Sequence, residues 1–412
     1  MTPPKIEPLP FPKTLGSDAK RWLEGYGFVA KQPMIRSSDY ELCLHCPFQY
    51  YLSRRLGLTP ALRWSSALSR GSWFHTCAEH INDTPVIRKS KIKAALVDRK
   101  RELHEMCNLL GVIGDSRDSI LQREEKDAMS ACAWFDAAVQ VKIGDTNKTF
   151  VETVFAPHFE YLGSEVVMRY EDSLIQADAL LYHKGQNSVW IVDYKTCAES
   201  PTQRLQTCPY EFQTQHYLFT TNYLLGEGTL QRKFDLPEDA RIGGMYHIAV
   251  QKPSINFGSK DRDCEIIEHE LQRGPRKGQI EIRRKYHGEP RYENYLNRCK
   301  DWYHATGEYE ELAPERVGDP VVNISSTSGR ICDPSLDPAW LYEYHRRLRY
   351  INHWREVDPV PANFLKSAKA LSQHGKMNVF APFYMTTPDK WPEILNREGF
   401  LFEDRDDVEV TV

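Results

Sequence analysis

The chain has 412 residues, of which 41% are hydrophobic and 27% are charged, and its formal net charge is −4. A chain of this size can bury one large core with accessory elements, or form two domains. The small net charge excludes a general attraction to polyanions, so a nucleic-acid surface would have to be a local basic patch. No run approaches the roughly 18 consecutive apolar residues of a membrane span.

Three regions are expected along the chain. Residues 1–33 form a proline-rich arm without an apolar signal segment, which favours an intracellular, cytoplasmic protein. Residues 34–310 form the expected core with a helical insertion at about 88–142, and residues 311–412 form an accessory region. In that compartment the 10 cysteines are interpreted as reduced thiols or metal ligands rather than as disulfides.

Helices are predicted in the first third of the chain. Residues 37–58 favour two short helices hinged at Pro47. A further helix is expected with Ser72 as its N-cap, because apolar residues at helical spacing follow it. Two more are expected at about 88–110 and 117–142.

Strands dominate after residue 149. They are predicted at 149–160, 164–170, 174–182, 188–195 and 242–251, with a helix at 210–225. Two strands and a helix near 292–305 are expected within 263–308, then a loop-rich stretch and a helix near 338–354. This order predicts an α/β fold with a mixed sheet flanked by helices.

Two aspartates and a lysine lie on the predicted hairpin around residues 184–187. If the turn is centred on that segment, Asp178 faces Asp193 directly, with Cβ atoms about 4.5–5.5 Å apart. Two carboxylates in this position repel each other unless they bind a divalent cation. Lys195 points to the same face as Asp193. A cation can polarise a phosphate and activate water, while a lysine stabilises developing negative charge.

A solvated surface pair is the ordinary alternative for an Asp-x-Lys motif on a strand. Here Trp190, Ile191 and Val192 flank the motif and indicate a buried strand. Charges in a buried strand need a partner or a function. Downstream, Gln213 and Tyr217 are four residues apart and share one face of a predicted helix.

Together these motifs resemble the RecB-like branch of the PD-(D/E)XK nuclease superfamily, which includes the nuclease domains of RecB and AddB and CRISPR-associated adaptation nucleases. The matching elements, in order, are Cys46-Pro-Phe-Gln-Tyr with Leu56-Gly-Leu, Gly71-Ser-Trp-Phe-His75, Asp178, Asp193-Tyr-Lys195, and Gln213 with Tyr217. The order of five elements is more specific than any one of them.

The resemblance implies a restriction-endonuclease-like mixed sheet and a role for each matching residue. His75, Asp178, Asp193 and the backbone carbonyl of Tyr194 would bind Mg²⁺ or Mn²⁺. Lys195 would stabilise charge or orient water, and Gln213 and Tyr217 would complete the catalytic site. Glu152, on a predicted strand, and Glu79, one helical turn after His75, are weaker candidates.

Several relatives hold an iron–sulfur cluster through an early cysteine and a compact C-terminal trio. Here Cys208, Cys264, Cys299 and Cys332 are widely spaced, and Cys43-x-x-Cys46 has no second half. A cluster is therefore not expected. Two basic groups are candidate DNA-binding surfaces: Lys89, Lys91, Lys93, Arg99, Lys100 and Arg101, and then Arg283, Arg284, Lys285 and Arg291. A solvated helix face explains the first group equally well.

The predicted function is that of a metal-dependent DNA exonuclease acting on ends or single strands in replication, recombination or repair. A structure-specific or nonspecific endonuclease would use the same chemistry, and a catalytically silent nucleic-acid-binding protein is the other alternative. No Walker-type phosphate loop occurs, so a helicase would have to be a separate partner. A stand-alone nuclease would suit a virus-encoded protein acting in its host cell.

Overall fold

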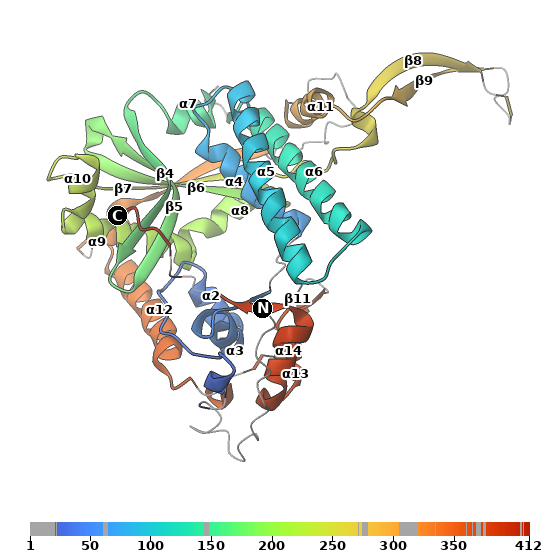
Figure 1. Ribbon diagram of the computed structural model, residues 1–412. Coiled ribbons are helices and arrows are strands. Elements are labelled where there is room, and N and C mark those ends of the chain that lie inside the picture. The colour runs from blue at the N-terminus through green and yellow to red at the C-terminus, as the bar shows by residue number, and fades with distance from the viewer. Residues whose placement is uncertain are drawn as a thin grey trace.

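In the computed structural model of this chain (Figure 1), the described residues are 21–412, except 22, 61–64, 144–147, 271, 274–278, 305–319, 334, 360, 365, 368–371, 374–375, 404–405 and 407. Most of the predicted N-terminal arm, and the part of the predicted loop-rich stretch before residue 320, lie outside the described residues.

A five-stranded sheet forms the centre of the molecule, with the strand order β10-β7-β6-β5-β4. Its strands are β4 (Phe159–Tyr170), β5 (Ser173–His183), β6 (Ser188–Cys197), β7 (Arg241–Gln251) and β10 (Val322–Ser328). All neighbouring strands run antiparallel except β6 and β7, which are parallel. The predicted mixed sheet is therefore confirmed, although the sequence did not reveal β10.

Helices cover both faces of this sheet (Figure 1). The larger ones are α4 (Ser66–Glu79), α5 (Pro85–Leu109), α6 (Asp115–Ala138), α9 (Phe212–Gly226), α11 (Tyr292–His304) and α12 (Pro338–Glu356). Leu181 and Val192 pack in the core shared with α4 and α6, whereas Leu180 and Ile191 pack in the core shared with α9 and α12. Successive strand residues point to opposite faces, so the two central strands are buried on both sides.

Helix α4 begins earlier than its sequence predicted. Its N-cap is Ser65, whose side chain accepts a hydrogen bond from the Leu68 N–H, so the expected N-cap at Ser72 is wrong. The helix continues through its glycine because Glu124 of α6 accepts hydrogen bonds from Ser69 and Trp73 on either side, at 2.8 Å and 3.0 Å. Tertiary contacts thus outweigh the low helix propensity of glycine.

The predicted strand at 149–160 is also wrong in its first half, because residues there form the short helix α7 (Phe150–Val154). Glu152 accepts the backbone N–H of Thr149 at 2.8 Å in a capping box. This local bond favours a helix start over an extended strand. Glu152 therefore does not lie on a strand of the sheet.

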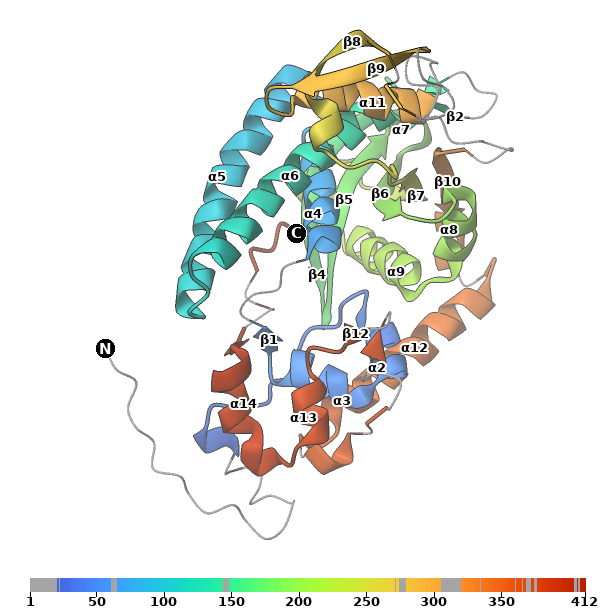
Figure 2. The same cartoon turned by 90° about the vertical axis from the view of Figure 1, so that its right-hand side faces the viewer.

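A third core joins the two ends of the described chain (Figure 2). It contains α2 (Asp39–His45), α3 (Pro47–Tyr50), a π-helical turn (Tyr51–Arg55), β1 (Leu58–Pro60), α13 (Ala381–Met385), α14 (Trp391–Glu398) and β13 (Phe400–Phe402). The predicted helical pieces on either side of Pro47 are confirmed, and β1 pairs with β13. Segments more than 300 residues apart in sequence thus form one core.

The remaining elements are short or peripheral. They are β2 (Lys142–Ile143), β3 (Lys148–Thr149), α8 (Pro201–Thr207), α10 (Thr229–Phe234), β8 (Asp263–Glu270), β9 (Ile280–His287), β11 (Ser372–Gln373) and β12 (Lys376–Met377). The predicted pair of strands β8 and β9 forms a hairpin that projects from the body of the molecule (Figure 1).

Candidate active site

The hairpin of β5 and β6 has the register that the sequence predicted. Ala179 pairs with Val192 and Leu180 pairs with Ile191, so the same register would place Asp178 opposite Asp193. The ladder ends one residue before that pair. Instead of continuing the ladder, the backbone N–H of Tyr194 donates to Asp178 Oδ2 at 2.6 Å. The two aspartates therefore lie on adjacent strands where the hairpin opens.

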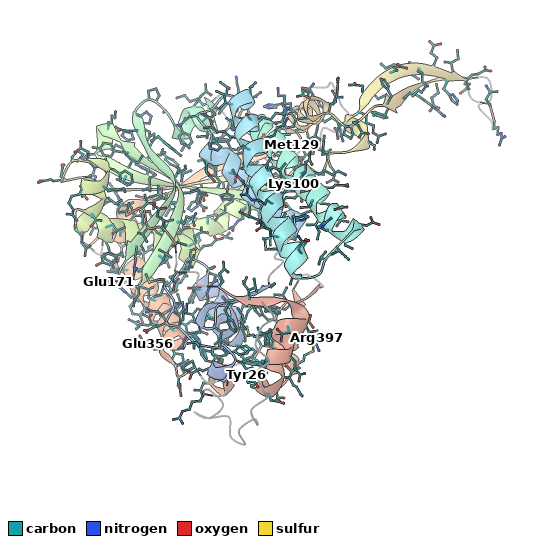
Figure 3. All side chains as sticks on the ribbon, viewed as in Figure 1. Tyr26, Lys100, Met129, Glu171, Glu356 and Arg397 are labelled. Carbon is teal, nitrogen blue, oxygen red and sulfur yellow. The ribbon has the colours of Figure 1, made fainter. Side chains whose placement is uncertain are left out.

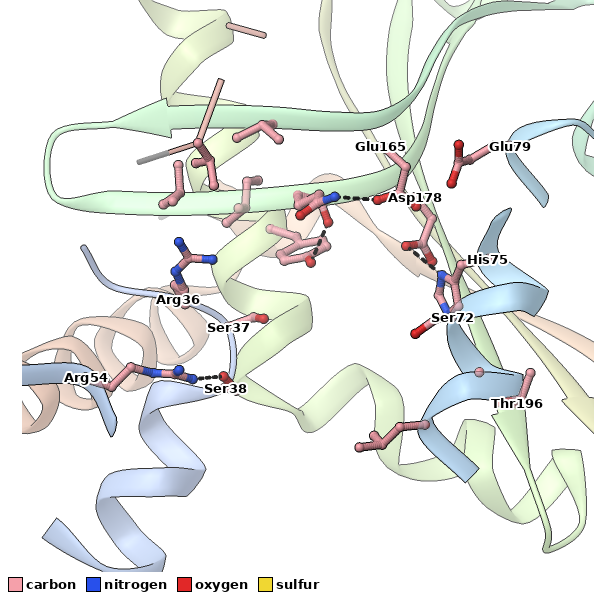
Figure 4. A pocket seen from close by; sticks show the side chains of 18 of the residues that line it. Arg36, Ser37, Ser38, Arg54, Ser72, His75, Glu79, Glu165, Asp178 and Thr196 are labelled. Carbon is pink, nitrogen blue, oxygen red and sulfur yellow. Dashed lines mark hydrogen bonds and ion pairs between the residues drawn. The ribbon is translucent and has the colours of Figure 1, made fainter. Parts of the chain in front are cut away.

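Helix α4 brings His75 to this opening (Figure 4). His75 Nδ1 lies 3.2 Å from Asp178 Oδ1, with 33% and 14% of the two side chains exposed. Burial acts to lower the pKa of His75, but the hydrogen bond and the charge of Asp178 outweigh it and raise the pKa above its ordinary value. The imidazole is thus held beside a carboxylate that remains accessible from outside.

Glu165 of β4 joins this pair, and the sequence prediction missed it. One ligand atom from each of His75, Glu165 and Asp178 lies within 4.8 Å of the others. Glu165 has a φ of 48°, a left-handed conformation uncommon for a residue other than glycine. It lies between the pairs Ser164–Ala179 and Val166–Ala177, directly across from Asp178. Strained backbone of this kind concentrates at functional sites.

The sequence did contain a signal for Glu165. The turn after Tyr170 joins two predicted strands, and Tyr170 pairs with Ser173. Counting back from that turn places Glu165 opposite Asp178. The prediction of two separate strands at 149–160 and 164–170 concealed this register, because β4 is one continuous strand from Phe159.

Negative charge is in excess around His75. Burial, with the nearby charges of Asp178 and Glu79, raises the pKa of Glu165 to about 7. Burial likewise raises the pKa of Glu79, which lines the same cleft. Carboxylate oxygens with one imidazole suit a divalent cation such as Mn²⁺ or Mg²⁺. The residues present therefore fit a cation, which would relieve the repulsion that these acids experience without one.

Asp193, by contrast, has its charge balanced by neighbours on three elements. Its Oδ1 is 2.8 Å from Lys195 Nζ and accepts from Gln213 Nε2 of α9 at 3.2 Å. Its Oδ2 is 3.4 Å from His247 Nδ1 of β7. Burial alone would raise the pKa of Asp193, but Lys195 and His247 outweigh it and lower the pKa to about 2. This carboxylate is 2% exposed and stays ionised.

His247 is a second residue that the sequence prediction missed. It lies beside Asp193 in the parallel pairing of β6 and β7, and its Nε2 is 3.3 Å from Thr327 Oγ1 of β10. The parallel register was not predictable without knowing which strand follows β6 in the sheet. The imidazole fixes one oxygen of Asp193 and leaves the other to Lys195 and Gln213.

The predicted Gln213–Tyr217 pair reaches the site from α9. Gln213 Oε1 accepts from Lys195 Nζ at 2.7 Å, so the amide holds both the lysine and Asp193. The Tyr217 hydroxyl donates to the backbone carbonyl of Gln176 at 2.6 Å. The Gln176 side chain in turn donates to Glu165. Gln213 therefore contacts the predicted catalytic groups, whereas Tyr217 anchors the strand beside them.

These groups lie in a cleft with a volume of about 900 Å³. His75, Glu165 and Asp178 lie at one end, and Arg36 and Arg54 line the other (Figure 4). Buried Asp39 binds the Arg54 guanidinium at 2.7 Å, and Ser38 accepts a second bond from it at 2.9 Å. The cleft thus combines an acidic end with a basic end, as a phosphate-containing substrate bound through a cation would require.

The basic residues predicted to bind DNA lie elsewhere. Lys89, Lys91, Lys93, Lys100 and Arg101 lie on α5, and Arg283 and Arg284 lie on β9. Figure 3 shows Lys100 on the outer helical layer. Most of them form ion pairs with neighbouring acids: Lys89 with Glu293, Lys91 with Asp83, Lys100 with Glu125, Arg101 with Asp98, and Arg283 with Glu281. All seven belong to the described part of the chain, outside the set of residues that line the cleft.

The early cysteines lie in the third core rather than at the site. The Tyr384 hydroxyl donates to Cys46 Sγ at 2.9 Å, and burial raises the pKa of the Cys43 thiol well above its usual range. Ligation of a metal requires the thiolate. These two thiols act here as packing groups of the aromatic core.

Residues 37–223 match the family model of the PD-(D/E)XK nuclease superfamily. The fold is a PD-(D/E)XK nuclease fold. The matched stretch contains His75, Glu165, Asp178, Asp193 and Lys195. Because nucleases of this superfamily depend on divalent metals, the match implies metal-dependent hydrolysis of nucleic acid. No curated protein matches the chain.

The predicted restriction-endonuclease-like class is confirmed by this match and by the mixed sheet. Within the described ranges, the helices are too short or too polar to cross a membrane.

Proposed function

We propose that the protein is a Mg²⁺- or Mn²⁺-dependent deoxyribonuclease that hydrolyses phosphodiester bonds at the His75–Glu165–Asp178 cluster. The observation that carries this proposal is the convergence of the three ligand atoms within 4.8 Å of one another. The cluster lies on the floor of a cleft whose opposite end is basic. The match to the PD-(D/E)XK nuclease superfamily supports the same chemistry.

The cation would be held by His75, Glu165 and Asp178, with Asp193 and the backbone carbonyl of Tyr194 contributing from β6. When bound, a divalent cation polarises the phosphate and lowers the pKa of a coordinated water. Asp178 is held for this role by the Tyr194 N–H, which binds the oxygen that faces away from His75. The raised pKa of Glu165 means that the cation competes with a proton for this carboxylate.

Lys195 would stabilise the negative charge that develops on the phosphate. Burial acts to lower its pKa, but Asp193 outweighs this and raises the pKa, so the ammonium stays charged. Gln213 and Asp193 hold the Nζ at 2.7 Å and 2.8 Å. A preorganised cation of this kind is worth more in a partly buried site than in water.

An exonuclease mode on DNA ends or single strands is favoured by the walls of the cleft. They come from α4, from residues near α2, from β4 and β5, and from Val408 of the C-terminal segment. A strand bounded on several sides is reached most readily from a free end. The motifs from Cys46 to Tyr217 support placement in the RecB-like branch, and with it a role in recombination or repair beside a separate helicase. A viral source is part of the same proposal.

The basic groups on α5 and β9 are proposed as an outer surface for the DNA duplex. Their ion pairs with exposed acids are weak and exchange readily with phosphates. Binding through them would depend steeply on salt.

The proposal is tested with end-labelled linear duplex, circular single-stranded and linear single-stranded DNA, each with Mg²⁺, Mn²⁺ or EDTA. We expect metal-dependent loss of linear substrates and survival of circles. Cutting of circles would identify an endonuclease instead. Binding without cleavage under every metal condition, unchanged by replacing Asp178, would rule out the catalytic proposal.

A further inference from the structure

The C-terminal segment, residues 403–412, crosses from the third core to the edge of the central sheet (Figure 1). At its start, the Glu403 N–H donates to the Gly57 carbonyl at 2.8 Å. At its end, the N–H groups of Thr411 and Val412 donate to the Val167 carbonyl of β4, at 2.8 Å and 3.1 Å. Between these anchors Val408 lines the catalytic cleft. The segment therefore lies along one wall of the cleft.

Gly57 shows how closely the first anchor is packed. It has a φ of 65°, and a Cβ built on it would meet the Glu403 carbonyl oxygen at 2.4 Å. Only glycine fits this approach. The start of the segment is thus fixed by backbone contacts, independently of its acidic side chains.

The acidic side chain of Asp406 binds a basic corner of the cleft. Its Oδ2 accepts the backbone N–H of Met34 at 2.8 Å, and its Oδ1 lies 3.5 Å from Arg36 Nη2. Arg54 and Lys31 line the same small pocket. A carboxylate held by a backbone N–H and a guanidinium shows that an anion is stable at this point.

The same corner belongs to the cleft that contains the metal cluster. Arg36 and Arg54 line the small pocket around Asp406 and also the catalytic cleft. Arg54 is oriented by Asp39, whose carboxylate is fully buried. An anion bound here lies in a continuous cleft with His75 and Asp178.

We propose that Arg36 and the Met34 N–H form a subsite for a backbone phosphate of the nucleic-acid strand, which Asp406 occupies in the free protein. A phosphate carries its charge on oxygens that accept the same donors as a carboxylate. The Arg36–Asp406 pair is 27% and 28% exposed, and such pairs are weak enough to exchange. Nucleic acid must therefore displace Asp406 to fill the cleft. This inference rests on the proposed function, because it assumes that the cleft takes nucleic acid.

The test measures binding of a fluorescein-labelled single-stranded oligonucleotide by anisotropy in EDTA, so that no cleavage occurs. Asp406→Asn keeps the shape and the acceptor for Met34 but removes the charge, and we expect it to tighten binding about three- to tenfold. Arg36→Gln should weaken binding and lower the slope of log affinity against log salt by about one. In the double variant, the gain from Asp406→Asn should disappear.

Two controls match these changes in charge. Glu409→Gln removes an exposed acid from the same segment, and Arg397→Gln removes an arginine of α14 (Figure 3). Both should change affinity less than twofold, because long-range charge effects are screened at physiological salt. Arg36→Lys should bind more tightly than Arg36→Gln, and unfolding curves identify any variant that loses its fold.

Equal effects of Asp406→Asn and Glu409→Gln would contradict the subsite, as would an Arg36→Gln variant with unchanged affinity and salt slope. So would full retention of the Asp406→Asn gain in the double variant. Cleavage is measured separately with Mg²⁺. Absence of cleavage alongside the expected binding changes would overturn the proposed catalysis but leave the subsite supported.

Discussion

Glu165 and Asp193 lie on the two strands that flank Asp178, yet their charges are balanced in opposite ways. Glu165 faces Asp178 and Glu79, and its pKa is raised to about 7. Asp193 faces Lys195 and His247, and its pKa is lowered to about 2. One side of the site thus has too much negative charge for its surroundings, and the other is already neutralised.

This difference separates binding of a cation from positioning of a lysine. A cluster whose acids repel one another gains most from a divalent ion, because the ion replaces repulsion by attraction. A neutralised acid gains less, but it fixes the position of its partner, here Lys195. The strained backbone at Glu165 is consistent with a side chain placed for function rather than for stability.

The largest effect is expected for the carboxylate that both sides share. Asp178→Asn keeps an oxygen for the Tyr194 N–H but removes the charge beside His75. We expect metal-dependent cleavage to fall about 10³-fold or more. The matched control is Glu152→Gln, which changes an acid that serves only the start of α7. Initial rates on labelled DNA measure both, and near-normal activity of Asp178→Asn would break the comparison at its centre.

A smaller effect on rate is expected on the neutralised side. Lys195→Gln removes the ammonium while leaving a polar group for Gln213, and we expect the cleavage rate to fall about 10²-fold with little change in Michaelis constant. Lys184→Gln is the control, since Lys184 pairs with exposed Glu160 outside the site. A change confined to the Michaelis constant would show that Lys195 binds substrate without stabilising the transition state.

Stability without metal should change in opposite directions on the two sides. Asp193→Asn leaves the buried Lys195 and His247 without their counterion, and we expect the free energy of unfolding to fall by about 3 kcal/mol. Glu165→Gln removes one of two opposed like charges, and we expect a gain of up to about 1 kcal/mol. Urea unfolding in EDTA at pH 8 measures both. Two changes of the same sign would remove the distinction between the two sides.

The smallest effect concerns pH. The pKa of Glu165 in the folded protein, about 7, lies above the model value of 4.5. Its contribution to stability is therefore fully present below pH 4.5 and is lost as the pH rises through 7. Glu165→Gln should flatten this part of the stability profile measured in EDTA. An identical slope in the variant would show that another group titrates there.

The sequence predicted the parts of the site that follow from local pattern. The turn between β5 and β6 set the register of Asp178 and Asp193, and the ordered motifs brought in His75 and Gln213. Glu165 was missed because one strand was divided into two, which hid its pairing with β5. His247 depends on the choice of neighbouring strand, and local periodicity carries no information about that choice.

Contacts between distant segments were beyond local pattern altogether. Arg36 and Asp406 meet only because β1 pairs with β13 and the third core brings both ends of the chain together. The expected helix N-cap at Ser72 failed for a related reason, since Glu124 of α6 stabilises the preceding turn of α4. Tertiary hydrogen bonds decided both outcomes.

Binding of Mn²⁺ to the free protein, measured by isothermal titration calorimetry at pH 8, tests the cation site most directly. We expect saturable binding to the unmodified protein and to Glu152→Gln, and at least about a tenfold loss of affinity in both Asp178→Asn and Glu165→Gln. Unchanged Mn²⁺ affinity in Asp178→Asn and Glu165→Gln would contradict a cation site at His75, Glu165 and Asp178.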